Sequence, residues 1–300
     1  MNNKRKTTVA GMFYDQNTQS LEKQIQECFT HTIGPGSLPK EKTMDRKNVL
    51  GVIVPHAGLP CSGPFAAHSF YTLVEYGFPD TIILIGPNHS GMGPEVAVDP
   101  KGEWETPLGP LSIDEQIATK LSSTNPITAD AATLHQRENS LEVQLPFIKY
   151  FSNQLNKKCS IVPLVMSQQN LETSKQVGEE FTKIINNEQK HVAIVASSDF
   201  SHEGYSYGRF PPSGLTADEF ARKQDKYALD AIQQKNPEVL FKNIQNKGIS
   251  MCGYGPVITL LTVATHYPEL SVELLKYGTS HDTCSDSNTC VGYGALAVTN

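Results

Sequence analysis

Two histidines in this sequence lie just past the ends of short apolar runs. His56 comes after the run at residues 49–54, and His89 comes after the run at 81–85. Each run is typical of a central parallel strand that is buried on both faces. Ligands of open α/β sheets bind outside the carboxyl ends of the strands. Two imidazoles delivered to that edge by separate strands therefore indicate a metal or catalytic site.

A third apolar run leads into polar side chains of the same kind. The run at 191–196 is followed by Asp199 and His202, three positions apart on one loop after the predicted strand. Cys252 precedes a helical pattern at 257–265, where the exposed N–H groups and the helix dipole favour the thiolate. Thiolate is the form that binds metals or attacks electrophiles, so Cys252 joins the candidate residues.

This combination predicts a mononuclear metal site made by His56, His89 and Cys252. Two neutral imidazoles and one anionic ligand leave positions open for substrate, water or dioxygen. A carboxylate as the anion suits non-haem Fe(II), and a thiolate also suits zinc or copper. Taken singly, each residue has an ordinary explanation as a hydrogen-bonded loop histidine or a small buried thiol. Their predicted convergence at one edge of one sheet favours a site.

His202 is the candidate general acid–base of that site. The unperturbed pKa of histidine, near ~6.5, suits proton transfer at neutral pH. Asp199 is expected to fix the tautomer of His202 or to orient a ligating histidine. The alternative for Asp199 is a structural role, capping a turn or helix after the strand.

A second polar concentration lies at residues 135–142. His135, Glu138 and Glu142 have the spacing of one helical face, which we expect either to meet the site or to form a solvated helix start. His135 and Glu138 are candidate pocket residues. Cys61, close after His56 in the chain, is a third candidate for the pocket.

Composition limits the function classes. The chain has 300 residues, a net charge of −6 and a charged fraction of 19%, without a long basic run, so nothing indicates nucleic-acid binding. No apolar run approaches the ~20 residues of a membrane span, and no signal peptide is evident. We therefore expect a cytoplasmic protein. A cytosolic setting favours reduced thiols over disulfides for the six cysteines.

One cysteine cluster lies near the end of the chain. His281, Cys284 and Cys290 occur in a stretch rich in Ser, Asp and Asn. No CxxC pair is present, and short clusters without a known spacing are poor metal motifs. We interpret this stretch as a polar turn that holds two thiols.

Helical and strand patterns alternate along the whole chain, which favours an α/β fold. We expect a single domain over residues 1–300, with a central mixed, largely parallel β-sheet and helices on both of its faces. Besides the three strands before the site residues, strands are expected at 160–165, 270–277 and 291–298. Helices are expected at 20–29 with Ser20 as its cap, 66–75, 113–121, 141–151 with a kink at Pro146, 171–185, 218–233, 237–246 and 257–265.

Together, several motifs resemble those of the Memo family, whose fold is similar to that of class III non-haem iron extradiol dioxygenases. The resemblance covers nearly the whole chain. The motifs are AGMFY at 10–14, PHAG at 55–58, GPNH at 86–89, ENSLE at 138–142, SSDFSH at 197–202, CG at 252–253 and VGY at 291–293.

The resemblance carries expectations for the site. The metal-site residues of the family match His56, His89 and Cys252, and further pocket residues match Asp199 and His202. In the related dioxygenases a glutamate takes the place of Cys252, so ordinary ring cleavage is not implied. The resemblance implies iron or copper binding and redox chemistry. We expect Fe(II), with copper and zinc as alternatives.

The resemblance also bears on partners. Eukaryotic members are linked to cell motility and receptor-phosphotyrosine signalling. Prokaryotic members often accompany an AMMECR-like domain and a radical-SAM enzyme, which are candidate partner proteins here. The sequence thus supports a redox enzyme or oxygenase acting on an unknown small molecule. The alternative is a module that binds a peptide or phosphopeptide without turnover, or an accessory protein of a radical-SAM system.

Two departures from the family pattern affect the expected pocket. Asn139 stands where the family usually has a second histidine. Leu59, Pro60 and Cys61 stand where an aromatic-rich turn is usual. If Asn139 and Cys61 line the pocket, the substrate or the preferred metal is altered.

Overall fold

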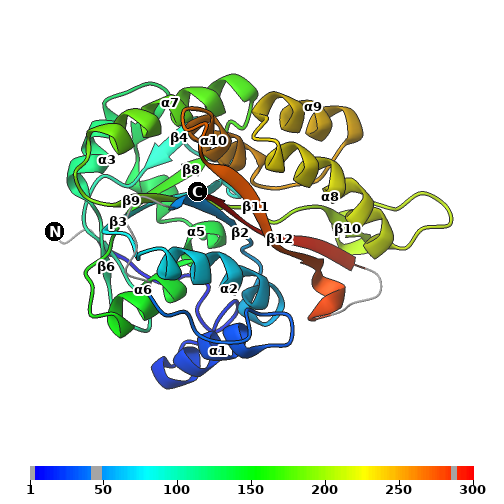
Figure 1. Ribbon diagram of the computed structural model, residues 1–300, viewed down its shortest axis with the longest axis horizontal. Coiled ribbons are helices and arrows are strands. Elements are labelled where there is room, and N and C mark those ends of the chain that lie inside the picture. Colours follow the sequence, from blue (N-terminus) through cyan, green and yellow to red (C-terminus); the bar gives the residue numbers. More distant parts are fainter. Residues whose placement is uncertain (1–3, 42–48, 285–288) are drawn as a thin grey trace.

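A central nine-stranded sheet organises the protein (Figure 1). The computed structural model describes residues 4–41, 49–284 and 289–300. The strand order is β10-β12-β2-β9-β3-β8-β4-β7, and β11 pairs with β12. The strands are β2 (Val49–Val54), β3 (Thr81–Pro87), β4 (Val96–Val98), β7 (Ile127–Ala129), β8 (Ser160–Met166), β9 (Val192–Ser197), β10 (His202–Gly204), β11 (Ser271–Thr279) and β12 (Thr289–Thr299). A small second sheet contains β1 (Lys4–Arg5), β5 (Glu103–Trp104) and β6 (Leu111–Ser112).

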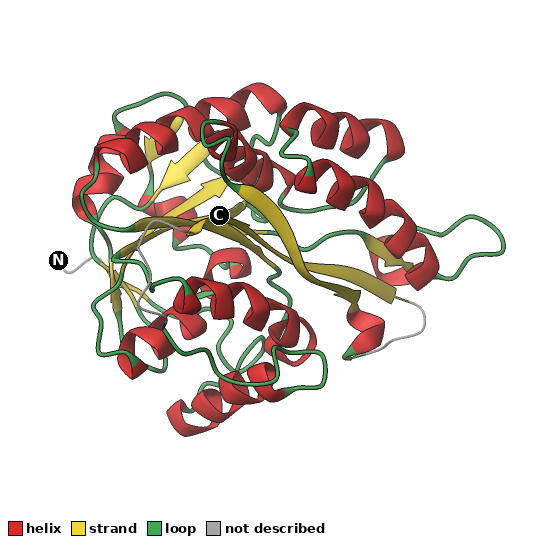
Figure 2. Ribbon diagram, viewed as in Figure 1, coloured by secondary structure: helices red, strands yellow, loops and turns green. Residues whose placement is uncertain are grey.

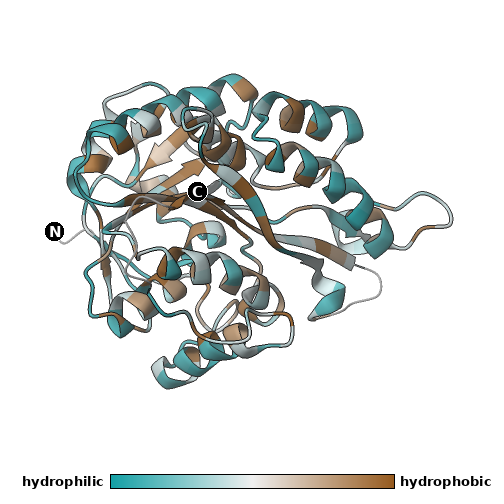
Figure 3. Ribbon diagram, in the orientation of Figure 1, coloured by the Kyte–Doolittle hydropathy of each residue, from teal (hydrophilic) through white to brown (hydrophobic). Residues whose placement is uncertain are grey.

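The sheet is mixed, with a parallel centre. Strands β2, β9, β3 and β8 run parallel to one another, whereas β12 is antiparallel to β2 and β4 is antiparallel to β8. Every residue of β2, β3 and β9 is buried, as expected for parallel strands covered on both faces. These strands form a brown, hydrophobic band through the middle of the molecule (Figure 3). The expected α/β class is confirmed.

Helices cover both faces of the sheet (Figure 2). On one face lie α1 (Thr18–Thr30), α2 (Leu59–Glu75), α5 (Asn139–Glu142) and α6 (Leu145–Gln154). The other face carries α3 (Glu115–Ser122), α7 (Leu171–Asn187), α9 (Pro237–Lys247) and α10 (Tyr254–Thr265). Helix α8 (Ala217–Gln233) packs on β11 and β12. The remaining short helices are α4 (Ala131–Leu134) and the 3₁₀ turns η1 (Tyr205–Tyr207) and η2 (Ser280–Asp282).

The starts of three helices differ from the sequence-based expectation in ways that capping residues and prolines explain. Helix α2 starts at Leu59 rather than residue 66, because Pro60 fits its first turn, where no backbone N–H is needed. Helix α1 is capped by the Asn17 side chain, which accepts a hydrogen bond from the Ser20 backbone N–H. The helix expected at 141–151 is two helices, α5 and α6, and Pro146 lies in the first turn of α6 rather than at a kink.

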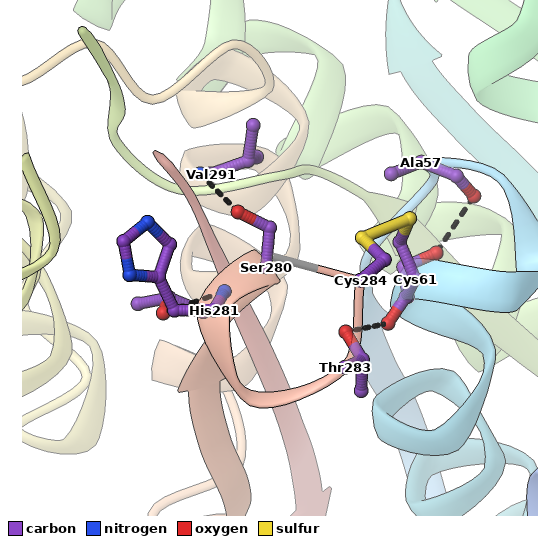
Figure 4. Close-up of a disulfide and its surroundings, with 9 residues drawn as sticks. Ala57, Cys61, Ser280, His281, Thr283, Cys284 and Val291 are labelled. Carbon is purple, nitrogen blue, oxygen red and sulfur yellow. Dashed lines mark hydrogen bonds between the residues drawn. A yellow bond between two sulfur atoms is a disulfide. The ribbon is translucent and has the colours of Figure 1, made fainter. Parts of the chain in front are cut away.

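The cysteines are not all reduced thiols, contrary to expectation. Cys61 and Cys284 form a disulfide, with their Cα atoms 5.2 Å apart (Figure 4). Cys28, Cys159, Cys252 and Cys290 are free. The expectation assumed a reducing compartment. The sequence did not reveal that the start of α2 lies beside the turn after β11. Among the described residues, no helix is both long and apolar enough to cross a membrane.

Candidate metal centre

Three strand ends bring the candidate residues together. His56 lies two residues beyond β2, His89 two residues beyond β3, and Asp199 two residues beyond β9. Because β9 pairs with both β2 and β3 in parallel, the three loops leave the sheet at the same edge. Cys252 reaches this edge from the loop before α10, and its Sγ lies 3.5 Å from the Asp199 carbonyl oxygen.

His56, His89 and Cys252 form one compact cluster. The nearest potential ligand atoms of the three side chains all lie within 4.8 Å of one another. Cys252 Sγ is 3.2 Å from His56 Nε2, and the centroids of the two imidazole rings are 5.4 Å apart. His56 is buried, Cys252 is half-buried, and His89 is exposed on the pocket side. The cluster therefore extends from the protein interior to the solvent-exposed pocket.

The loop of Cys252 is held tightly against β9. The Gly253 backbone N–H donates a hydrogen bond of 3.0 Å to Ser198 Oγ, and Gln169 Nε2 donates one of 2.9 Å to the Cys252 carbonyl oxygen. A Cβ atom on Gly253 would lie 2.4 Å from the Ser197 carbonyl oxygen, closer than real contacts. Glycine is therefore required for Cys252 to approach His56 as closely as it does.

Hydrogen bonds fix the tautomer of His56. Ser197 Oγ donates to the Ser140 carbonyl oxygen at 2.6 Å, so its proton is not available to the imidazole. His56 Nδ1, 2.9 Å from Ser197 Oγ, must then be the donor of their hydrogen bond. The lone pair of His56 consequently lies on Nε2, the nitrogen nearest Cys252 Sγ. This is the form of imidazole that binds a metal.

Glu138 plays the same part for His89. Its Oε1 accepts a hydrogen bond from His89 Nδ1 at 3.0 Å, and its Oε2 accepts one from the His89 backbone N–H at 2.7 Å. In the neutral His89 ring the proton is therefore on Nδ1 and the lone pair on Nε2. Burial alone would raise the pKa of Glu138, but its hydrogen bonds and the charge of His89 lower that pKa to about 2. The carboxylate is ionised at neutral pH and holds the ring in place.

The pKa values of the cluster follow from burial and neighbouring charge. Burial lowers the pKa of His56 to about 4, so this imidazole is neutral at neutral pH. Burial also opposes a charge on His89, but its contacts with Glu138 raise the His89 pKa above the ordinary value. Burial, with the charge of Asp199 next, raises the pKa of the Cys252 thiol. The predicted thiolate bias from the helix start is therefore wrong, because the buried sulfur beside the Asp199 charge favours the protonated thiol.

Asp199 contacts the candidate ligand His56, which is one of its two expected roles, and does not pair with the His202 ring. Asp199 Oδ1 accepts a hydrogen bond of 2.7 Å from the His56 backbone N–H, so Asp199 supports the loop of a cluster residue. The His202 ring is oriented by Ser250, whose carbonyl oxygen accepts from Nδ1 at 3.1 Å. Tyr207 packs edge-on against His202, with 4.9 Å between ring centroids. His202 Nε2 is left available to a molecule in the pocket.

A pocket of about 330 Å³ opens beside the cluster. Its polar lining consists of His56, His89, Asn139, Asp199 and His202. Its remaining lining consists of Phe13, Ala57, Gly58, Tyr207, Val291 and Tyr293. Asn139, one of the departures from the family pattern, is thus at the pocket surface, and its Nδ2 donates to the His56 carbonyl oxygen at 3.4 Å.

The residues of the second polar stretch lie apart, because α4 and α5 are separate helices. His135 Nε2 is 2.8 Å from Asp99 Oδ2, and His135 is not among the pocket-lining residues. Glu142 forms a buried ion pair with Arg5. The single helical face expected at 135–142 is therefore absent, although Glu138 still reaches the cluster by capping α5. Cys61 is not among the pocket-lining residues and is bound to Cys284 in the disulfide.

Sequence reasoning missed Ser197 and Tyr207 as site residues. Ser197 ends β9, two positions before Asp199, and its role depends on the Ser140 carbonyl oxygen that takes its proton. Tyr207 belongs to a stretch whose aromatic content is visible in the sequence, but only the turn η1 shows that this ring meets His202. The serine had a usable signal, its place in the SSDFSH motif.

The fold and the cluster define an α/β protein with two histidines and a cysteine at the carboxyl edge of its parallel strands. A family model described as Memo-like protein matches residues 5–297. A MEMO1 family protein from Methanobrevibacter smithii is 38% identical over 292 residues, which cover 97% of this chain and 98% of that protein. One from Sulfurisphaera tokodaii is 38% identical over 291 residues, covering 96% and 97%. The chain belongs to the Memo family.

A solved structure also resembles this protein. The crystal structure of an uncharacterized protein from Escherichia coli K12 matches with a TM-score of 0.50 and 14% sequence identity. The match covers 81% of this chain and 98% of that protein. At this identity the likeness supports the fold alone.

Proposed function

We propose that this protein binds one divalent transition metal through His56 Nε2, His89 Nε2 and Cys252 Sγ. The single observation that carries the proposal is the pair of hydrogen bonds that His56 Nδ1 donates to Ser197 Oγ and His89 Nδ1 donates to Glu138 Oε1, which turn the Nε2 atom of each neutral ring toward the shared space. Hydrogen bonds of this kind on the second ring nitrogen are usual for metal-binding histidines. The donor set fits Fe(II), and it also fits copper and zinc.

The protonation state of the Cys252 thiol predicts how metal binding should depend on pH. Its thiol is protonated at neutral pH because burial and the Asp199 charge oppose a thiolate. A bound cation would reverse this preference, since ligation requires the deprotonated sulfur. Metal binding at this site should therefore release a proton, and its affinity should increase with pH. His89, whose pKa is raised by Glu138, must also give up its proton, whereas the neutral His56 contributes none.

We further propose that the pocket serves a redox reaction on a small molecule. When bound, the metal would supply redox chemistry next to the pocket. His202 Nε2 would accept or return a proton, because Ser250 fixes the proton of Nδ1. Phe13, Tyr207 and Tyr293 would hold the apolar part of the substrate.

The pocket lining is poorly suited to the non-catalytic alternative in which the protein binds a phosphopeptide. Phosphate recognition in proteins relies on arginine clusters or comparable donors. None of the described residues that line the pocket is a lysine or an arginine. The lining does include the carboxylate of Asp199 and the amide of Asn139. This lining favours a neutral or weakly charged small molecule over a phosphopeptide.

Equilibrium dialysis under anaerobic conditions tests the metal site. Wild type dialysed against Fe(II) or Zn(II) should retain about one equivalent per chain by elemental analysis, and His56→Ala and Cys252→Ser should lose most of it. Cys159→Ala, which removes a buried free thiol away from the cluster, is the matched control and should retain the metal. Full retention by both site variants would refute the proposed ligands.

A further inference from the structure

We propose that the Cys61–Cys284 disulfide is a reversible redox modification site, at which exchange with a dithiol loosens one wall of the pocket. The bridge joins segments 223 residues apart in the sequence. Figure 4 shows Cys61 at the start of α2, facing Cys284 just beyond the turn η2. Neither cysteine is a member of the metal cluster.

On the α2 side, the bridge is tied to the loop that carries His56. The Cys61 backbone N–H donates a hydrogen bond of 2.9 Å to the Gly58 carbonyl oxygen. The neighbouring Ser62 Oγ donates one of 2.7 Å to the Ala57 carbonyl oxygen. Ala57 and Gly58 both line the pocket. A displacement of Cys61 would therefore be passed to the pocket wall through two short hydrogen bonds.

On the opposite side, the bridge is tied to β12. Ser280, in η2, accepts a hydrogen bond of 3.1 Å on its Oγ from the Val291 backbone N–H. Thr283 Oγ1 donates one of 2.8 Å to the Cys61 carbonyl oxygen, beside the sulfur bridge. Val291 is itself a pocket-lining residue. The disulfide thus fastens two walls of the same pocket to each other.

Apolar packing connects the two sides beneath the bridge. Phe65, Val291 and Tyr293 form a small buried cluster of their own, and Ala57 and Cys61 pack against it. The rings of Phe65 and Tyr293 have centroids 5.5 Å apart. This cluster is separate from the main core, so its order depends more strongly on the contacts across the bridge. Because Tyr293 also lines the pocket, a loss of order in this cluster would change the pocket wall.

The bridge is open to exchange from one side. Cys284 is exposed and Cys61 is half-buried, so an incoming thiolate would attack Cys284 Sγ. The S–S bond breaks, a mixed disulfide forms on Cys284, and Cys61 leaves as a thiolate that takes up a proton. The second thiol of the dithiol then attacks the mixed disulfide and releases Cys284 as a thiol. The protein gains two electrons and two protons, and the dithiol becomes a cyclic disulfide. A low-molecular-weight disulfide reverses the exchange.

Reduction removes the covalent link and leaves weaker contacts between the two walls. The Thr283–Cys61 hydrogen bond remains, but a hydrogen bond near solvent contributes little net stability. The start of α2 and the turn at 280–284 should then open locally more often. Because the His56 loop is attached to the start of α2, a looser wall should also weaken the metal site. That last effect rests on the proposed function, whereas the exchange and the local opening do not.

The test compares oxidised and reduced forms of the folded protein by hydrogen–deuterium exchange. Wild type is treated with dithiothreitol and desalted under nitrogen, and the double variant Cys61→Ser/Cys284→Ser reproduces the reduced state without reductant. Native thiol titration should show two additional thiols after treatment. Amides at 57–62 and 280–284 should exchange about tenfold faster in both reduced forms. Cys159→Ala is the control and should exchange like oxidised wild type.

Two outcomes would overturn the proposal. One is a bridge that dithiothreitol does not open in the folded protein. The other is unchanged exchange at 57–62 in reduced wild type, which needs no substitution and so does not depend on the folding of the variant. Zn(II) titration of the same samples separates the two proposals. Loss of affinity on reduction supports the coupling to the metal site, whereas no binding in either form refutes the metal site and leaves the exchange result standing.

Discussion

His56 Nε2 lies 3.2 Å from Cys252 Sγ, although the two residues are 196 positions apart in the chain. The contact is produced by two features of the fold. The end of β2 places His56 at the carboxyl edge of the parallel strands, and Gly253 lets the loop before α10 pack directly on the end of β9. The Gly253 contact can be perturbed without changing a proposed ligand, and so can the hydrogen bond from His89 to Glu138.

Glu138→Gln should weaken metal binding while leaving all three ligands in place. The substitution removes the negative charge that orients His89 and increases the basicity of its ring. Loss of such a partner typically lowers metal affinity by about 10- to 100-fold. Zn(II) titration by competition with a chromophoric chelator measures the change. Glu172→Gln, at an exposed position on α7, is the control, and equal affinities for the two variants would refute the role of Glu138.

Gly253→Ala should lower both the stability of the protein and its metal affinity. The new Cβ would meet the Ser197 carbonyl oxygen at 2.4 Å and Ser198 Cβ at 2.7 Å, so the Cys252 loop must move. Overpacking of this kind costs about 1–3 kcal/mol. Gly178→Ala creates a similar clash between α7 and Thr262, away from the cluster. Urea denaturation should show both variants destabilised, and metal titration should show a loss only for Gly253→Ala.

His202→Ala should separate proton transfer from metal binding. His202 lines the pocket but is not one of the three clustered ligands, so the variant should keep about one equivalent of metal. Loss of a general acid–base typically slows turnover by about 10²–10⁴-fold. Oxygen consumption by the iron-loaded protein, measured across a panel of catechols and thiols, is the assay. Equal rates for the variant and wild type with every active compound would remove His202 from the reaction.

The ionisation of Asp225 should lower the free energy of unfolding as the pH rises through weakly acidic values. Burial raises the pKa of Asp225 from 3.8 to about 7, against the hydrogen bonds from Ser201 and Tyr277. The folded protein therefore holds this proton more tightly than the unfolded chain does. The resulting stability is present at low pH and is lost as the pH rises from 3.8 to about 7.

Urea denaturation between these pH values measures the effect. Asp225→Asn should remove a slope in the free energy of unfolding of up to about 1.4 kcal/mol per pH unit, relative to wild type. Asp230→Asn, at an exposed position on the same helix, should keep the wild-type slope. The same pH dependence in wild type and Asp225→Asn would show that Asp225 has no raised pKa.

The parts of the site that follow local rules were predictable from the sequence. His56 and His89 were placed because buried parallel strands have a recognisable composition and their ends meet at one edge. Glu138 could not be assigned to His89, 49 residues away, because that contact depends on the break between α4 and α5. The bridge between Cys61 and Cys284 depends on where the turn after β11 meets α2. The thiol state of Cys252 depends on burial, which spacing does not reveal.

X-ray absorption spectroscopy of the zinc-loaded protein tests the central claim most directly, because it reports the atoms bound to the metal. Ligation by His56, His89 and Cys252 predicts one sulfur at about 2.3 Å and two imidazole nitrogens at about 2.0–2.1 Å, with the rest of the shell from light atoms. In Cys252→Ser the sulfur shell should vanish. A wild-type spectrum without sulfur, or one whose sulfur persists in Cys252→Ser, would contradict the proposed metal centre.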